Sequence, residues 1–298
     1  MRTHPRPRAS ILLLTAVVCL ASSRVSETAP PAAAVHRPLK HRLHDGEVCR
    51  GAFLGLLAGG PAAQFLAGQG FDFFILDLEH YTFDETTVRE MIIAARAAGI
   101  APILRVGEPT QQVTRWLDTG AEGIVVPTVE SRAQAEALVK YARYRPLGER
   151  GASSMNGHTD FARVPDLPAF LERRNREIVL LVMIETPKGL ERADEILSTP
   201  GIDGAIMGTG DYSQDIGLAG QPDHPEVWKA AERLISICRR KNKLVSVPIR
   251  RPENVAHWVD AGLNMLTFVD LAVVSQGIQL NFAEIEKARC GKHGPARP

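Results

Sequence analysis

The segment FDFFILDLEHYTFD, residues 71–84, decides the fold of this chain. Its apolar centre, FFIL, is typical of a strand that is covered on both faces. The strand then leads directly into three ionisable residues, Asp77, Glu79 and His80. Because ionisable groups are costly to bury without partners, their position at the end of a buried strand predicts the floor of an active site.

The rest of the domain alternates short apolar runs with helical patterns. Strands are expected at 51–57, 71–78, 101–106, 123–127, 178–185, 204–207, 244–247 and 263–269. Helices are expected at 85–98, 111–119, 132–143, 190–198, 226–241, 252–260 and 278–289. Eight strands that alternate with helices over this length predict an α/β protein with one (β/α)8 TIM barrel. The segment 145–177 is long for a connection, so we expect it to form a functional loop beside the site.

The N-terminal region has a different composition. Arg2, Arg6 and Arg8 precede the apolar run ILLLTAVVCLA, which has the layout of a secretory signal peptide and is too short to span a bilayer. We expect an exported, periplasmic protein; the alternative is a cytoplasmic protein whose leader is a start-site artefact. The expected domains are a signal-like segment at 1–23, a disordered linker at 24–38, the catalytic barrel at 39–290 and a disordered tail at 291–298.

Composition excludes several classes of protein. With 45% hydrophobic residues and a formal net charge of +1, the chain can bury a large core and has no electrostatic bias towards nucleic acid. The four cysteines, Cys19, Cys49, Cys238 and Cys290, lack CxxC spacing. They indicate neither a zinc site nor a disulfide framework. The sequence therefore predicts a soluble globular protein that is not an integral membrane protein.

Charged residues also end other expected strands. Arg105 closes the third strand, Glu185 closes the fifth, and Asp211 follows the sixth through a short glycine turn. Each of them alone could be a helix cap or a solvated loop residue. In a TIM barrel, however, the carboxyl ends of the strands meet at one mouth, where active sites lie. We therefore expect these three residues to converge with Asp77 and His80.

The carboxylates of Glu185 and Asp211 suggest a metal. No Cys or second His lies near them in the sequence, which suits a hard divalent cation such as Mg²⁺ or Mn²⁺, with Co²⁺ as a further option. Lys188 lies in a segment that starts a helix, and the sixth strand offers no lysine for a Schiff base. Covalent imine chemistry is therefore disfavoured.

Two further features suit an anionic substrate. Arg105 could hold a carboxylate through two hydrogen bonds, which a lysine could not reproduce; the alternative is a structural ion pair, for example with Glu108. The turn formed by Gly208, Thr209 and Gly210 could present backbone N–H groups to a carboxylate or phosphate.

Taken together, these motifs resemble the HpcH/HpaI aldolase family over residues 38–284. Members are metal-dependent class II pyruvate aldolases and include 4-hydroxy-2-oxoheptanedioate and 2-dehydro-3-deoxyglucarate aldolases. The matching blocks, in order, are FDFFILDLEH, PILRV, GAEGIVVPTVES, RYRPLGERG, MIETPKG and GIDGAIMGTGDYSQDIGLAG. The resemblance implies a phosphoenolpyruvate/pyruvate-type barrel that acts on a 2-oxo acid and an aldehyde.

The resemblance also implies roles for individual residues. Glu185 and Asp211 would bind the divalent metal, and Arg105 would hold the pyruvyl group. His80 would be the catalytic base, paired with Asp77.

Family members typically assemble as hexamers, arranged as trimers of dimers, with an exchanged C-terminal helix. Asp118, in the block RWLDTG, matches the position of a substrate-binding residue that a neighbouring subunit lends to the site. Glu79 is expected to support the site from outside the pocket or to contact the neighbouring subunit.

The chain departs from the family pattern at several positions. Met183 stands where the family usually has glutamine, and the usual GPxDLS block has Thr209, Gly210 and Tyr212. The loop at 152–161 also differs; its His158 could face an aldehyde, but we expect it to lie in a solvated segment. These departures leave the substrate preference open.

The sequence thus predicts a divalent-metal-dependent aldolase that reversibly cleaves a 4-hydroxy-2-oxo acid to pyruvate and an aldehyde. His80 would remove the proton of the 4-hydroxyl group. One alternative is a non-catalytic exported barrel that binds a carboxylate or a sugar acid. The other is a lyase that acts on CoA thioesters, although no added basic site for a nucleotide tail is evident.

Overall fold

The computed structural model describes residues 37–292. The predicted signal-like segment, nearly all of the linker and most of the C-terminal tail lie outside the described residues. Between residues 37 and 292, no helix is long and apolar enough to cross a membrane.

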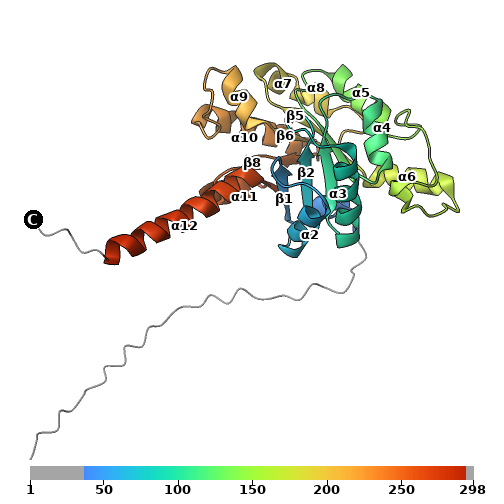
Figure 1. The fold of residues 1–298 in the computed structure, drawn as a ribbon. Helices are drawn as coiled ribbons and strands as arrows, with labels where there is room; N and C mark the ends of the chain where they lie inside the picture. Colours follow the sequence, from blue (N-terminus) through green and yellow to red (C-terminus); the bar gives the residue numbers. More distant parts are fainter. Residues whose placement is uncertain (1–36, 293–298) are drawn as a thin grey trace, which may run out of the picture. The chain divides into compact units, whose positions relative to one another are not determined.

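Nine parallel strands form one nearly closed sheet (Figure 1). Around the sheet the order is β7-β6-β5-β4-β3-β2-β1-β9-β8. The strands are β1 (Cys49–Leu54), β2 (Phe73–Asp77), β3 (Ala101–Arg105), β4 (Gly123–Val126), β5 (Val179–Ile184), β6 (Gly204–Met207), β7 (Leu244–Ser246), β8 (Pro248–Ile249) and β9 (Met265–Val269). The predicted (β/α)8 barrel is confirmed, and every expected strand is present.

The seventh barrel strand is split into two parts. β7 pairs with β6, and β8, one residue further along the chain, pairs with β9. Pro248 has no N–H group to donate to a ladder, which accounts for the interruption. Together β7 and β8 therefore bridge β6 to β9 and bring the sheet close to a full ring.

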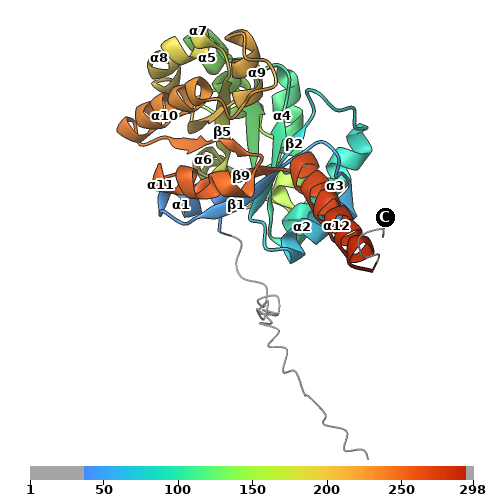
Figure 2. The ribbon, with the colours of Figure 1, turned by 90° about the vertical axis from the view of Figure 1, so that its left-hand side faces the viewer.

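The helices lie around this sheet (Figure 2). They are α1 (Leu39–His44), α2 (Gly60–Gly68), α3 (Glu85–Ala98), α4 (Gln111–Asp118), α5 (Arg132–Ala142), α6 (Leu167–Glu177), α7 (Pro187–Glu191), α8 (Ala193–Leu197), α9 (Thr209–Asp215), α10 (Pro225–Arg240), α11 (Val255–Asp260) and α12 (Asp270–Lys292), with 3₁₀ turns η1 (Gly157–Thr159) and η2 (Pro252–Asn254). Helix α3 shows how single residues determine where a helix begins and ends. Asp84 accepts the N–H groups of Thr86 and Thr87 at its start, and Gly99 ends it in the left-handed conformation.

The sequence did not predict α1, α2, α6 or α9. Helix α2 begins in the glycine and proline segment at 59–61, which is more typical of a turn. Helix α6 lies within the segment 145–177, which was expected to be a loop beside the site. This segment is instead partly helical, and none of its residues lines the pocket described below.

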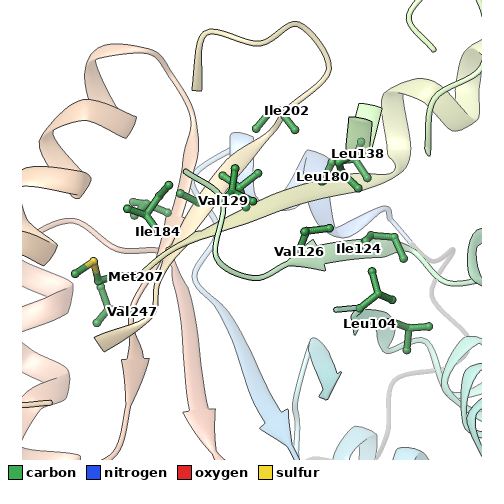
Figure 3. Close-up of a cluster of buried hydrophobic side chains, with 14 of the residues drawn as sticks. Leu104, Ile124, Val126, Val129, Leu138, Leu180, Ile184, Ile202, Met207 and Val247 are labelled. Atoms are coloured by element: carbon green, nitrogen blue, oxygen red, sulfur yellow. The ribbon is translucent and has the colours of Figure 1, made fainter. Parts of the chain in front are cut away.

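Alternating residues of each strand face two different parts of the core. Phe73 and Ile75 of β2 belong to the cluster inside the barrel, whereas Phe74 and Leu76 belong to the cluster between the sheet and the helices. Figure 3 shows part of the outer cluster, with Leu180 of β5 near Leu138 of α5. This two-sided burial is the reason why the strands read as continuous apolar runs.

Helix α1 covers the amino end of the barrel. Leu39 and Leu43 pack into the inner cluster with the first residues of several strands, including Cys49 and Val179. The Leu39 N–H group donates to the Glu122 carboxylate at 2.7 Å. The carboxyl end of the barrel is therefore the end that remains available for a site.

Arg143, directly after α5, joins several chain segments near the amino ends of β5 and β6. It is completely buried and donates to the carbonyl groups of Asn175, Ile178 and Gly201. Its Nη2 also pairs with the Asp203 carboxylate at 2.6 Å. A neutral side chain at this position would leave several carbonyl groups without their donor and would remove one of the two cations that pair with the Asp203 carboxylate, the other being Lys40.

We therefore expect Arg143→Met to lower the free energy of unfolding by about 3 kcal/mol, measured by urea denaturation at unchanged m-value. The control is Arg132→Met at the start of α5, because Arg132 is exposed and pairs with Glu136 on the surface. That change should cost at most about 0.5 kcal/mol. Equal midpoints for the two variants would contradict the role assigned to Arg143.

Candidate active site

A cavity of about 270 Å³ lies at the carboxyl end of the barrel. Seven of the predicted site residues line it: Asp77, His80, Arg105, Gly208, Thr209, Gly210 and Asp211. Glu185 lies directly against Gly208, whereas Asp118 does not line the cavity. The structure thus brings eight of the nine predicted residues to one mouth.

Asp77 and Arg105 form a buried ion pair on the floor of the cavity. They are partners in the register of β2 and β3, and Arg105 donates to both Asp77 oxygens, at 2.8 and 2.5 Å. The remaining guanidinium nitrogen pairs with the Glu79 carboxylate at 3.0 Å. Arg105 therefore has two carboxylate partners, and neither of them is Glu108.

The expected side-chain pairing of Asp77 with His80 is not present. Asp77 Oδ1 accepts the backbone N–H groups of Glu79 and His80, and Arg105 occupies both oxygens. The His80 side chain is 55% exposed, and its Nε2 lies 3.8 Å from the Glu79 carboxylate. Glu79, which was expected to lie outside the pocket or at a subunit contact, is thus the carboxylate beside His80 within this chain.

Glu185 presents a buried carboxylate oxygen that has no hydrogen-bond partner. Its Oε1 accepts the backbone N–H and the hydroxyl group of Thr128, at 2.6 and 2.8 Å. Its Oε2 finds no donor among the described residues. Burial raises the pKa of Glu185; Thr128 opposes this shift, and the nearby carboxylates of Asp211 and Glu79 add to it. A bound cation would satisfy this oxygen and favour the charged form.

The residues present fit a divalent cation that keeps several positions open. Asp211 supplies a second carboxylate from the first turn of α9. Among residues 37–292, no group of three or more His, Cys, Asp or Glu side chains is arranged to hold a metal. Glu185 and Asp211 would provide two carboxylates, and the other positions would be left to water and substrate oxygens, as Mg²⁺ prefers.

Gly208 makes room for the Glu185 side chain. A Cβ atom at this position would lie 2.2 Å from Glu185 Oε2 and 2.4 Å from Glu185 Cβ. Atoms cannot approach this closely, so any other residue at position 208 would displace the carboxylate.

Asp118 lies at the end of α4 and belongs to a different cluster. It accepts from Arg150 at 2.5 Å and lies 3.4 Å from His158 Nδ1. Burial alone would raise the pKa of Asp118, but His158 and Arg150 outweigh this effect, and the pKa lies below its ordinary value. Its expected role in a neighbouring subunit's site stays a prediction.

The expectation that His158 lies in a solvated segment is wrong. Its side chain is fully buried and stacks on Phe170, with 5.2 Å between the ring centroids. The segment that carries it packs against Thr119 and Gly120 rather than lying open to solvent.

Three pocket or supporting residues were not predicted, although each follows a strand. Thr128 follows β4, Arg250 follows β8, and Asp270 follows β9. Asp270 accepts three consecutive backbone N–H groups at 55–57, which fixes the loop after β1. The rule that found the other site residues, a polar residue directly after an expected strand, would also have found Thr128 and Asp270, whereas the strand expected at 244–247 ends three residues before Arg250.

Known proteins resemble this chain over most of its length. The family model for HpcH/HpaI aldolase/citrate lyase matches residues 58–269. The chain is 32% identical to a pyruvate aldolase of Rhizobium etli over 240 residues, which cover 80% of this chain and 93% of the relative. It is 31% identical to a 4-hydroxy-2-oxo-heptane-1,7-dioate aldolase of Escherichia coli over 261 residues, which cover 86% and 96%.

Solved structures also resemble this chain over most of its length. An HpcH/HpaI aldolase from Desulfitobacterium hafniense DCB-2 superposes with a TM-score of 0.80 at 29% identity, over 88% of this chain and 99% of that structure. The citrate synthase SbnG gives a TM-score of 0.75 at 28% identity, over 86% and 99%.

The close approach of Gly208 to Glu185 predicts that Gly208→Ala is destabilising. The added methyl group has no room, so we expect a loss of about 1–3 kcal/mol in the free energy of unfolding, measured by chemical denaturation. The control is Gly210→Ala in the same turn, where a Cβ atom would meet Arg250 at an ordinary 3.5 Å. If the two variants were equally stable, the steric argument would be refuted.

Proposed function

Because the chain belongs to the HpcH/HpaI aldolase/citrate lyase family, we propose that it is a divalent-metal-dependent aldolase that reversibly cleaves a 4-hydroxy-2-oxo acid to pyruvate and an aldehyde. The observation that carries the proposal is the buried Glu185 oxygen, which has no donor among the described residues and is near enough to the Asp211 carboxylate for the two charges to interact through space. The names of the relatives disfavour both a non-catalytic barrel and a CoA-thioester lyase.

Glu185 and Asp211 would hold the cation in this proposal. When bound, Mg²⁺ or Mn²⁺ would polarise the 2-oxo group and offset the negative charge that develops as the bond between C3 and C4 breaks. The two carboxylates would otherwise repel each other and an anionic substrate. Glu185 directly follows β5, and Asp211, in the first turn of α9, lines the cavity.

Arg105 would hold the pyruvyl end of the substrate. Its Asp77 pair is buried and fixes the guanidinium, whereas Glu79 contacts it through one nitrogen and is partly exposed. A substrate oxygen could therefore replace Glu79 without breaking the buried pair. The turn at 208–210 lines the same cavity and could offer backbone N–H groups to that carboxylate.

His80 would act as the general base. It lines the cavity, and its side chain is 55% exposed, so a substrate hydroxyl group can reach the ring. In cleavage it would remove the proton of the 4-hydroxyl group, and in condensation it would return it. The Glu79 carboxylate lies 3.8 Å from His80 Nε2 and would face the ring during this transfer.

The proposal extends to assembly. Most of the length of α12 leads away from the strands in Figures 1 and 2. Its exposed apolar side chains need a partner in water: Leu271, Val273, Ile278, Leu280, Phe282 and Ile285. A homohexamer with exchanged C-terminal helices would cover them, and it would allow Asp118 to reach a neighbouring site.

Export through the N-terminal segment remains part of the proposal as well.

The proposed base gives one prediction. His80→Ala should lower kcat for pyruvate release from a 4-hydroxy-2-oxo acid by about 10²- to 10⁴-fold, with little change in KM, because the base acts in the transition state. The control is His41→Ala, since His41 is exposed on α1 at the amino end of the barrel. Unchanged turnover in the His80 variant would exclude it as the base.

Metal removal gives a second prediction. Excess chelator should abolish pyruvate release, and added Mg²⁺ or Mn²⁺ should restore it. Glu185→Gln and Asp211→Asn should each lower kcat/KM by roughly 100-fold and weaken Mn²⁺ binding measured by calorimetry. The matched control is Asp215→Asn at the other end of α9. Undiminished pyruvate release in excess chelator would refute the metal-dependent mechanism.

A further inference from the structure

Glu79 lies between the residue that would hold the 2-oxo acid and the residue that would act as the base. One of its oxygens, Oε2, is 3.0 Å from Arg105 Nη1 and 3.8 Å from His80 Nε2. Arg105 and His80 both line the cavity, whereas Glu79 does not. A single carboxylate oxygen therefore faces two cavity residues from a position outside the cavity lining.

The two carboxylates that pair with Arg105 are held differently. Asp77 accepts from Nε and Nη2 of Arg105, at 2.8 and 2.5 Å, and its Oδ1 also accepts two backbone N–H groups. Glu79 contacts the guanidinium at Nη1, and its side chain is 25% exposed, against 3% for Asp77. A partly exposed ion pair is worth much less than a buried, doubly hydrogen-bonded one. The Glu79 contact is therefore the one that can be exchanged when an anion reaches Arg105.

The charges around Arg105 favour this exchange. One guanidinium faces two carboxylates, so the group of three carries one negative charge in excess. The carboxylate of a 2-oxo acid at Nη1 would add another negative charge, which would repel Glu79. His80 offers Glu79 a second partner, because a ring that has taken a proton carries an N–H donor and a positive charge at Nε2.

The backbone around Glu79 is fixed, so the exchange needs movement of side chains alone. The backbone N–H groups of Glu79 and His80 both donate to Asp77 Oδ1, at 3.0 and 3.3 Å. The distance of 3.8 Å between Glu79 Oε2 and His80 Nε2 has to shorten by about 1 Å to become a hydrogen bond. Rotation of the long Glu79 side chain can supply this shift.

We propose that Glu79 is a positioning residue that moves from Arg105 to His80 when the 2-oxo acid binds. The substrate carboxylate takes the contact at Nη1, and the released Glu79 carboxylate orients the His80 ring and pairs with it once it holds the proton of the 4-hydroxyl group. The base is thus complete after the 2-oxo acid is in place. This inference rests on the proposed function for the identity of the substrate and of the base.

The kinetic test measures pyruvate release from a 4-hydroxy-2-oxo acid by the metal-loaded enzyme. Glu79→Gln keeps the size of the side chain and removes its charge. We expect kcat to fall about 10- to 100-fold, because a charge-assisted hydrogen bond to the base is lost. KM should stay the same or fall by up to about fivefold, because Arg105 loses a competing partner.

The control is Glu85→Gln, which removes an exposed carboxylate that pairs with Arg115 on the surface. Both kinetic constants should stay as in the wild type. A raised KM with unchanged kcat in Glu79→Gln would overturn the inference, because Glu79 would then merely hold Arg105 in place.

A double-mutant cycle tests whether Glu79 acts through His80. In the His80→Ala background, Glu79→Gln should change kcat by no more than about twofold, because the residue that it positions is gone. An equal fractional loss of kcat in both backgrounds would show that Glu79 acts independently of the base, and it would refute the positioning role.

Calorimetry provides a measurement that does not need turnover. Glu79 is near enough to Glu185 to interact with it through space, so its effect on the metal is measured first. Glu79→Gln should bind Mn²⁺ within about threefold of the wild type. A loss of Mn²⁺ binding as large as in Glu185→Gln would place Glu79 in the metal site and overturn the inference.

The metal-loaded proteins are then titrated with pyruvate. Glu79→Gln should bind pyruvate with a Kd equal to that of the wild type or up to about fivefold lower. Weaker binding of pyruvate would contradict the exchange at Arg105. If the wild type released no pyruvate from any 4-hydroxy-2-oxo acid, the proposed function would fail, whereas the pyruvate titration would still decide whether Glu79 competes for Arg105.

Discussion

The buried ion pair between Asp77 and Arg105 is the interaction on which the site depends. The two residues face each other in register at the carboxyl ends of β2 and β3, so the pair holds two strands together where the apolar barrel interior meets the mouth. A buried charge without a partner would be strongly destabilising, whereas this pair is satisfied by two hydrogen bonds and by backbone donors. It holds the Arg105 guanidinium in place on the floor of the cavity, where Glu79 is its second carboxylate partner.

Much of the fold and most of the site could be predicted because both follow from burial. Strands covered on two faces read as apolar runs, and polar residues at their carboxyl ends must meet at one mouth. Arg250 as a site residue and α2 as a helix were not predicted, and each has a local reason. Pro248 interrupts the seventh strand, so the strand seemed to end before Arg250, and the glycines and proline at the start of α2 are more typical of a turn.

Partners of individual side chains could not be predicted, because a position along a strand does not say in which direction a charged group turns. Asp77 was expected to orient the His80 ring, yet Arg105 occupies its oxygens, and Glu79 is the carboxylate nearest His80. His158 shows the same limit for loops. A loop histidine is usually solvated, but α6 folds over this one and buries it against Phe170.

Two departures from the usual family pattern fall on the contacts of the two arginines. Met183, which replaces a glutamine, places its sulfur 3.6 Å from Arg105, and Thr209, which replaces a proline, accepts a hydrogen bond from Arg250. A thioether is a weak acceptor, so Arg105 relies on its carboxylates, and a proline at position 209 could offer Arg250 no hydroxyl group. The two substitutions thus act on opposite sides of the mouth. One leaves the floor pair undisturbed, and the other adds a hydroxyl group beside the Arg250 guanidinium, so both change the surroundings of an arginine at the cavity while Glu185 and Asp211 are retained.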